Sequence, residues 1–244
     1  MQSPIEINEY ESIYSNDFSF VYQNYKVNLN LNAKLEANEN NYTFVVDIKD
    51  GGYLNFERGG VIKQYELKRI ELYPGLHKIN GDLPNYELHL VHEKNLDFKT
   101  NKNQYRRIQD PNMFLTIVLR YYNKDKCPKE NNGCSSDDNL LNDLKNGNFK
   151  SLNDYPVFQD KRAFLYEGSS MHIPCDENVN YYVIKDLFYC EDNLFNNLPL
   201  DSINLMNKYG RPVYKNFMNY REVLKSKFIS IKIITFLLII FILF

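Results

Sequence analysis

The chain has 244 residues, enough for one large domain, and its high aromatic content (15%) with few glycines favours strands over disorder. Basic and acidic residues nearly balance, at 29 Lys and Arg against 31 Asp and Glu, which excludes a polyanion-binding field over the whole surface and argues against a nucleic-acid-binding protein. The opening residues MQSPIEINEYES contain neither a basic region nor an apolar core, so we expect no secretory signal peptide.

Alternation of apolar and polar residues with a period of two predicts a single, mostly β domain with short helices. Residues 1–40 are expected to form an irregular lead-in with edge strands. The clearer strands are predicted at 42–48, 65–73, 86–92, 113–122 and 180–189. Glycine pairs at 51–52 and 59–60 predict turns. Two short helices are expected, one from Asp137 or Asp138 to Gly147 and one at 200–208.

The C-terminal residues 228–244, FISIKIITFLLIIFILF, are apolar on every face and predict a transmembrane helix. At 1.5 Å per residue this helix would span roughly 25 Å, slightly less than a hydrocarbon core of ~30 Å, and Lys232 could reach the interface. A buried core helix is the alternative. We therefore predict a domain over residues 1–224 and a single-pass membrane anchor at 228–244. Without residues 225–244 the chain carries 26 basic and 31 acidic residues.

Two of the four cysteines, Cys127 and Cys134, lie seven residues apart in the polar stretch CPKENNGC. This spacing is too wide for a CxxC metal site. A disulfide between them is expected if the domain faces an oxidising space, and free thiols are the alternative.

Four segments resemble motifs of the α-carbonic anhydrases and occur in the order found in that family. They are QSPIEI at 2–7, ELHLVH at 87–92, YEGSSMHIPCDENVNYYVIK at 166–185 and GRPVYKN at 210–216. The resemblance implies a central twisted antiparallel sheet with an active-site cone on one face. It also implies a Zn²⁺ ion held by three neutral histidines, with a water molecule in the fourth position.

The zinc-ligand positions of the family fall on Glu71, Tyr73 and His89, so only one of the three is a histidine. A carboxylate, a phenol and an imidazole are not an established zinc set, because tyrosine ligates only after losing a proton with a pKa near 10. His92 matches a structural histidine of the family and lies on the opposite strand face from His89. We expect His89 to be a hydrogen-bonded core residue and the chain to need no zinc cofactor.

The positions that orient the zinc-bound hydroxide in the family differ as well. The threonine position is Met171, which cannot donate the required hydrogen bond, and the glutamate position is Leu76. A proton shuttle would have to be His77 or His172. The sequence therefore predicts a protein that is not an enzyme, and a zinc hydratase with altered ligands is the enzyme-class alternative.

The chain is similar to the inactive branch found in poxvirus virion envelopes, whose members begin near the SPI motif, carry a tyrosine at the second ligand position and have a C-terminal membrane anchor. The relative differs in having a longer region before the anchor and a tail beyond it. This similarity implies a virion membrane protein that displays its N-terminal domain and binds a sulfated glycosaminoglycan such as chondroitin sulfate during host-cell attachment. Candidate sulfate-binding residues are Lys94, Lys99, Lys102, Arg106 and Arg107, and a second group of Arg58, Lys63, Lys68 and Arg69. Ordinary solvated charges, a protein-binding adhesion domain and homo-oligomer formation are left open.

Overall fold

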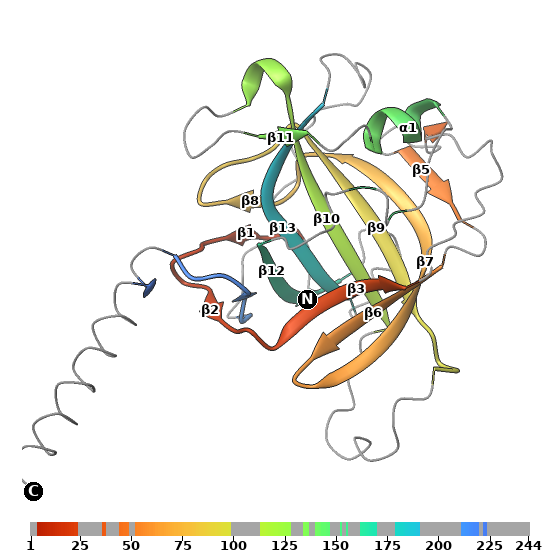
Figure 1. The fold of residues 1–244 in the computed structure, drawn as a ribbon. Helices are drawn as coiled ribbons and strands as arrows, with labels where there is room; N and C mark the ends of the chain where they lie inside the picture. The colour runs from red at the N-terminus through yellow and green to blue at the C-terminus, as the bar shows by residue number, and fades with distance from the viewer. Residues whose placement is uncertain are drawn as a thin grey trace, which may run out of the picture.

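The structure is a computed structural model, and one large curled sheet dominates it (Figure 1). It describes residues 4–23, 36–37, 44–48, 52–98, 113–127, 134–136, 140–146, 152, 155, 162–169, 179–190, 211–219 and 222–223. The strands are β1 (Glu6–Ile7), β2 (Ile13–Tyr14), β3 (Phe18–Gln23), β4 (Glu36–Ala37), β5 (Phe44–Asp47), β6 (Tyr53–Arg58), β7 (Val61–Pro74), β8 (Lys78–Ile79), β9 (Tyr86–Lys94), β10 (Phe114–Asn123), β11 (Ser135–Ser136), β12 (Ala163–Gly168), β13 (Val179–Cys190) and β14 (Tyr214–Lys215). The helical elements with two described ends are α1 (Leu140–Asn146) and the 3₁₀ turn η2 (Lys124–Lys126), and Glu222 and Val223 are also helical.

The strands follow the order β2-β14-β12-β13-β10-β9-β7-β5-β4, while β6 pairs with both β7 and β3. Most neighbours are antiparallel, but β10 and β13 run parallel in the middle of the sheet, and β14 and β2 run parallel at its edge. The predicted antiparallel sheet is therefore wrong at these pairs, and the sheet is mixed. More than 50 residues separate β10 from β13, so the chain has the length that a parallel crossover requires.

The five predicted strands all occur, as β5, β7, β9, β10 and β13, and the first predicted helix corresponds to α1. Strands β6 and β12 were not predicted, although both are short and rich in apolar residues. The predicted helix at 200–208 and the predicted anchor at 228–244 lie outside the described residues. Within the described part of the chain, no helix is long and apolar enough to cross a membrane.

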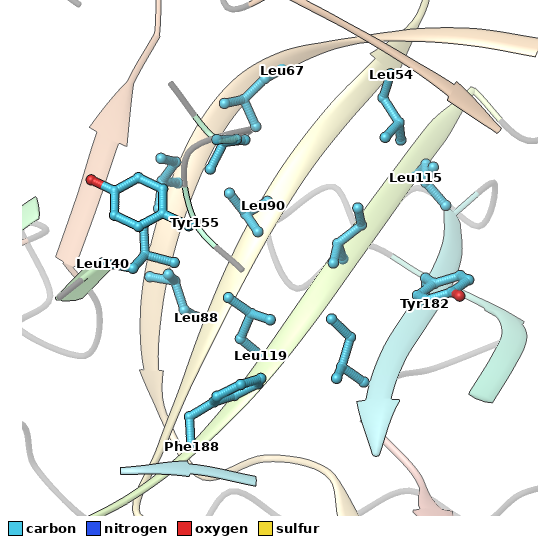
Figure 2. Packing of buried hydrophobic residues seen from close by; sticks show 14 of the residues in the cluster. Leu54, Leu67, Leu88, Leu90, Leu115, Leu119, Leu140, Tyr155, Tyr182 and Phe188 are labelled. Atoms are coloured by element: carbon cyan, nitrogen blue, oxygen red, sulfur yellow. The ribbon is translucent and has the colours of Figure 1, made fainter. Parts of the chain in front are cut away.

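Apolar side chains cover both faces of the sheet. Figure 2 shows leucines of β7, β9 and β10 on one face, packed with Tyr155 and Tyr182. The opposite face carries a second cluster, which includes Ile5, Ile7, Val118, Phe164, Tyr166, Tyr181 and Val183. Each fully buried large apolar side chain contributes about 1.5–3 kcal/mol, so the central strands are held from both sides. The functional candidates lie on the face of the second cluster.

Cys127 and Cys134 form a disulfide at the end of η2. It closes a short loop, and the Cys134 backbone N–H also points at the Cys127 sulfur.

Candidate functional site

A bulge in β7 sets which side chains reach the site. Leu67 pairs with His92 of β9, but the next paired residue of β7 is Arg69, opposite Val91, so Lys68 is an extra residue. A bulge of this kind reverses the inward and outward alternation beyond it. The apolar residues of β7 therefore change from odd to even numbers, and Arg69, Glu71 and Tyr73 turn to the face opposite the leucine core.

Glu71 is the centre of the first half of the site. It lies directly opposite His89 in the register between β7 and β9 and is almost fully buried. Its Oε1 accepts a hydrogen bond from Arg69 Nε at 2.9 Å, and its Oε2 accepts one from the Tyr73 hydroxyl at 2.9 Å. Both carboxylate oxygens are thus held by side chains of the same strand.

Tyr73 remains a protonated phenol in this environment. Burial raises the pKa of Tyr73 well above its ordinary value, and the negative charge of Glu71 raises it further. The positive charge of Arg69 opposes these two effects but is outweighed by them. The rings of Tyr73 and His89 pack against each other at an angle of 50°, with their centres 4.7 Å apart. Tyr73 therefore acts as a hydrogen-bond donor and a packing partner here.

Glu87 is the centre of the second half of the site and is completely buried. Its Oε2 lies 2.7 Å from His77 Nδ1 and 3.0 Å from His89 Nε2. Its Oε1 accepts hydrogen bonds from the backbone N–H groups of Leu76, at 3.1 Å, and His77, at 2.5 Å. The other ring nitrogen of His77 lies 2.7 Å from the Tyr166 hydroxyl. Four donors converge on one carboxylate, which makes Glu87 the hub of a buried polar network.

The pKa values of these groups follow from burial and from their neighbours. Burial alone would raise the pKa of Glu87, but His77 and His89 outweigh it and hold that pKa well below its ordinary value. Burial lowers the pKa of His89, and the hydrogen bond from His89 to Glu87 opposes this only in part. Burial also lowers the pKa of His92 to about 4. Glu87 is therefore ionised and His92 neutral at neutral pH.

The residues at the family's zinc-ligand positions do not fit a zinc ion. A zinc site needs deprotonated donors that converge on one point. The oxygens of Glu71 are engaged by Arg69 and Tyr73, and Tyr73 keeps its proton. His89 is the one neutral imidazole of the set, and Glu87 holds its Nε2.

A second cluster of metal-ligand types lies beside these positions. One donor atom from each of His77, Glu87 and His89 lies within 4.8 Å of the others. These atoms are close because they hydrogen-bond to one another, and both ring nitrogens of His77 already have partners. A metal ion would have to break those bonds, so the chemistry of this cluster is that of a hydrogen-bonded network.

The remaining predicted catalytic positions fall in different places. Leu76 is buried and provides a backbone N–H to Glu87. His77, one of the two histidines that could serve as a proton shuttle, has a fully buried side chain, and both of its ring nitrogens have hydrogen-bond partners. Met171 and His172 lie outside the described residues. His92 lies on the leucine face, where its Nδ1 is 2.9 Å from the Leu90 carbonyl oxygen.

The basic candidates for glycan binding are placed differently in the two groups. Three members of the second group have carboxylate partners, with Arg58 at 3.2 Å from Glu167, Lys68 at 2.7 Å from Glu66 and Arg69 at 2.9 Å from Glu71. The fourth, Lys63, stands on β7 opposite Phe56 of β6. In the first group Lys94 ends β9, while Lys99, Lys102, Arg106 and Arg107 lie outside the described residues.

Sequence reasoning missed Glu87 and Tyr166 as members of the site. Glu87 stands two residues before His89 on one strand, and this spacing was a usable signal because residues i and i+2 share a strand face. Tyr166 had no comparable local signal, because β12 reaches His77 only through the pairing of several strands. The same limit applies to Arg120 of β10, a buried guanidinium that donates to the Asp82 carbonyl oxygen at 2.9 Å.

A sequence model of the eukaryotic-type carbonic anhydrases matches residues 1–227. The chain belongs to this family. No curated protein sequence matches it. The family match covers the whole described part of the chain and confirms the carbonic anhydrase fold that the four collinear motifs predicted.

Two solved structures show the same fold at low sequence identity. Dioscorin complexed with ascorbate superimposes with a TM-score of 0.61 at 19% identity, covering 90% of this chain and 87% of dioscorin. The α-carbonic anhydrase from Thermovibrio ammonificans with the inhibitor sulfanilamide gives a TM-score of 0.56 at 16% identity, covering 87% and 86% of the two chains. At these identities the likeness shows the fold alone.

Proposed function

We propose that this protein is a carbonic anhydrase family member that does not hydrate CO₂ and uses the fold as a binding domain. The observation that carries the proposal is that all three side chains at the family's zinc-ligand positions are held by other groups. Glu71 is bound on both oxygens, Tyr73 stays protonated and His89 is tied to Glu87. Such a site cannot lower the pKa of a metal-bound water, which is the step that the family reaction requires.

The test is the metal content of the purified full-length chain together with its CO₂ hydration rate. We expect no stoichiometric zinc after incubation with excess Zn²⁺ and dialysis, and no hydration above the uncatalysed rate. An active α-carbonic anhydrase handled in parallel controls for zinc loss. One zinc per chain, or measurable hydration, would overturn the proposal and favour a hydratase with altered ligands.

We further propose that the domain is a virion surface protein that attaches to a sulfated glycosaminoglycan of the chondroitin sulfate class, and that residues 228–244 anchor it in the virion membrane. The anchor is supported by its apolar sequence, which is interrupted only by Lys232 and the small hydroxyl residues Ser230 and Thr235. Glycan binding is supported by the basic residues from Lys94 to Arg107. The second group is the weaker candidate, because Arg58, Lys68 and Arg69 already have carboxylate partners.

Binding of the full-length chain to immobilised chondroitin sulfate, with unsulfated chondroitin as the control, tests this assignment. Alanine at Lys99, Lys102, Arg106 and Arg107 together should abolish binding, and the exposed Lys126→Ala should leave it unchanged. Affinity should fall as salt concentration rises, because sulfate recognition is electrostatic. Binding to a protein partner that is insensitive to salt would instead assign the domain to adhesion between proteins.

A further inference from the structure

One edge of the sheet exposes large apolar side chains close to the point where the described chain ends. Strand β2 is the outermost strand there and pairs in parallel with β14 (Figure 1). The exposed fractions of Tyr10, Ile13 and Tyr14 are 67%, 51% and 39%, and that of Met218, just after β14, is 41%. Among the described residues, four of the eight exposed large hydrophobics thus belong to the segments 10–14 and 214–218, which we call the β2 edge.

A helix begins immediately beyond this edge. The Asn219 backbone N–H donates to Glu222 Oε2 at 2.8 Å, and the Glu222 N–H donates back to Asn219 Oδ1 at 3.0 Å. This reciprocal pair is a capping box, with Asn219 as the N-cap and Glu222 at the third helical position. The Val223 N–H then donates to the Asn219 carbonyl oxygen at 3.0 Å, which is the first α-helical bond.

The start of this helix is fixed to the sheet by a buried lysine. Lys215 of β14 has no exposed surface, and its Nζ lies 2.9 Å from Glu222 Oε1 and donates to the Glu9 carbonyl oxygen at 2.9 Å. Glu9 Oε2 is in turn 2.7 Å from Lys185 of β13. A buried cation without a partner is costly, so the contacts of Lys215 hold the helix start at a set position on the β2 edge.

The apolar run that begins at Phe228 starts only five residues beyond Val223. That distance is about 8 Å if the chain is helical and about 17 Å if it is fully extended. The polar interface of a bilayer is roughly 5–8 Å thick on each side. Lys225 and Lys227 fall in this short connection, where lysines are favoured at a membrane surface.

From these observations we infer that the β2 edge is the membrane-facing surface of the domain, with Tyr10, Ile13 and Tyr14 in the lipid interface. The inference rests on the proposed anchor at residues 228–244. Tyrosine is enriched where lipid meets water, because its ring is apolar and its hydroxyl is polar. A second copy of the chain is the poorer occupant of this edge, because β2 is only two residues long and offers few backbone groups for strand pairing.

Single tryptophans can report the position of each surface, because the chain contains none. Full-length Tyr10→Trp and Tyr14→Trp variants are reconstituted in phosphatidylcholine vesicles with and without brominated acyl chains. Leu96→Trp is the matched control, because Leu96 is 73% exposed and follows β9. Strand β9 is five strands from β2, which is about 24 Å measured along the curled sheet at 4.8 Å per strand. We expect a roughly twofold loss of fluorescence at positions 10 and 14 and none at position 96.

Flotation of the vesicles tests the proposed membrane anchor separately from the inferred membrane-facing surface. Protein that floats but shows no quenching at positions 10 and 14 would leave the anchor in place and overturn the membrane-facing edge. Concentration-dependent dimers in that case would assign the edge to a second copy. Protein that does not float would overturn both the anchor and the inference.

A flexible Gly-Ser insertion between Lys225 and Ser226 tests the role of the helix start. We expect flotation to persist and quenching at positions 10 and 14 to be lost, because the domain is then tethered without being oriented. Undiminished quenching in this variant would show that Lys215 and Glu222 do not set the orientation.

Discussion

Replacement of Glu87 by glutamine exchanges one carboxylate oxygen for an NH₂ group. Among substitutions of this size at the site, we expect it to lower the free energy of unfolding the most. The carboxylate accepts from two backbone N–H groups and two imidazoles, and a glutamine side chain would present an NH₂ group to one pair of these donors. Breaking a buried charged network by removing one partner costs about 3–5 kcal/mol. For a chain of this size the melting temperature should fall by roughly 6–20 °C.

Urea unfolding of the full-length chain in mild detergent, followed by far-UV circular dichroism, gives the change in the free energy of unfolding. The matched control is Glu167→Gln, because Glu167 is half-exposed and its ion pair with Arg58 contributes less than about 1 kcal/mol. If Glu87→Gln does not fold, Tyr166→Phe removes one outer bond of the same network at a cost of about 1 kcal/mol.

The pH dependence of this effect has a definite sign. The pKa of Glu87 is depressed in the folded state, so its contribution is complete above the unfolded pKa of about 4.5 and is lost as the pH falls below it. The difference in free energy of unfolding between the wild type and Glu87→Gln should therefore become smaller below pH 4.5. A difference smaller than about 1 kcal/mol at pH 7, or one that does not change with pH, would refute the assignment of Glu87 as the hub.

Three further changes test other parts of the site. Arg69→Met should lower the free energy of unfolding by about 2 kcal/mol, because it removes the cation that is paired with the buried Glu71 carboxylate. Urea titration measures this change, and a variant as stable as the wild type would contradict the pairing. The double variant Glu71→His, Tyr73→His should bind zinc, because both residues share a strand face and position 71 lies opposite His89. Metal analysis of the purified variant tests this. The absence of zinc would show that the three positions no longer converge on one point. The pKa of His92 is about 4 in the folded state against 6.5 for an unperturbed histidine, so wild-type stability should fall by about 3 kcal/mol between pH 6.5 and 4, and His92→Gln should flatten that slope. An unchanged slope in His92→Gln would assign the acid sensitivity to another group.

The strands and the family were accessible from the sequence because their signals are local or collinear. Alternation marked β7, β9, β10 and β13, and four short motifs in the right order indicated the carbonic anhydrase fold that the family match confirms. The replacements at Glu71 and Tyr73 were likewise visible. The mixed character of the sheet was not visible, because the parallel pairing of β10 with β13 depends on how the chain returns between them.

The sequence by itself determined which side chains stand at the family's zinc-ligand positions, because the collinear motifs and the residue order assign those positions. Only the tertiary structure decided what those side chains do. The bulge at Lys68 turned Arg69 toward Glu71 and made a candidate surface cation into a partner of the buried site. His77, which follows β7, contacts Glu87 of β9 and Tyr166 of β12, and these contacts place Glu87 at the centre of the buried polar network. Such pairings depend on packing distances between strands that are far apart in the chain, and no local pattern encodes them.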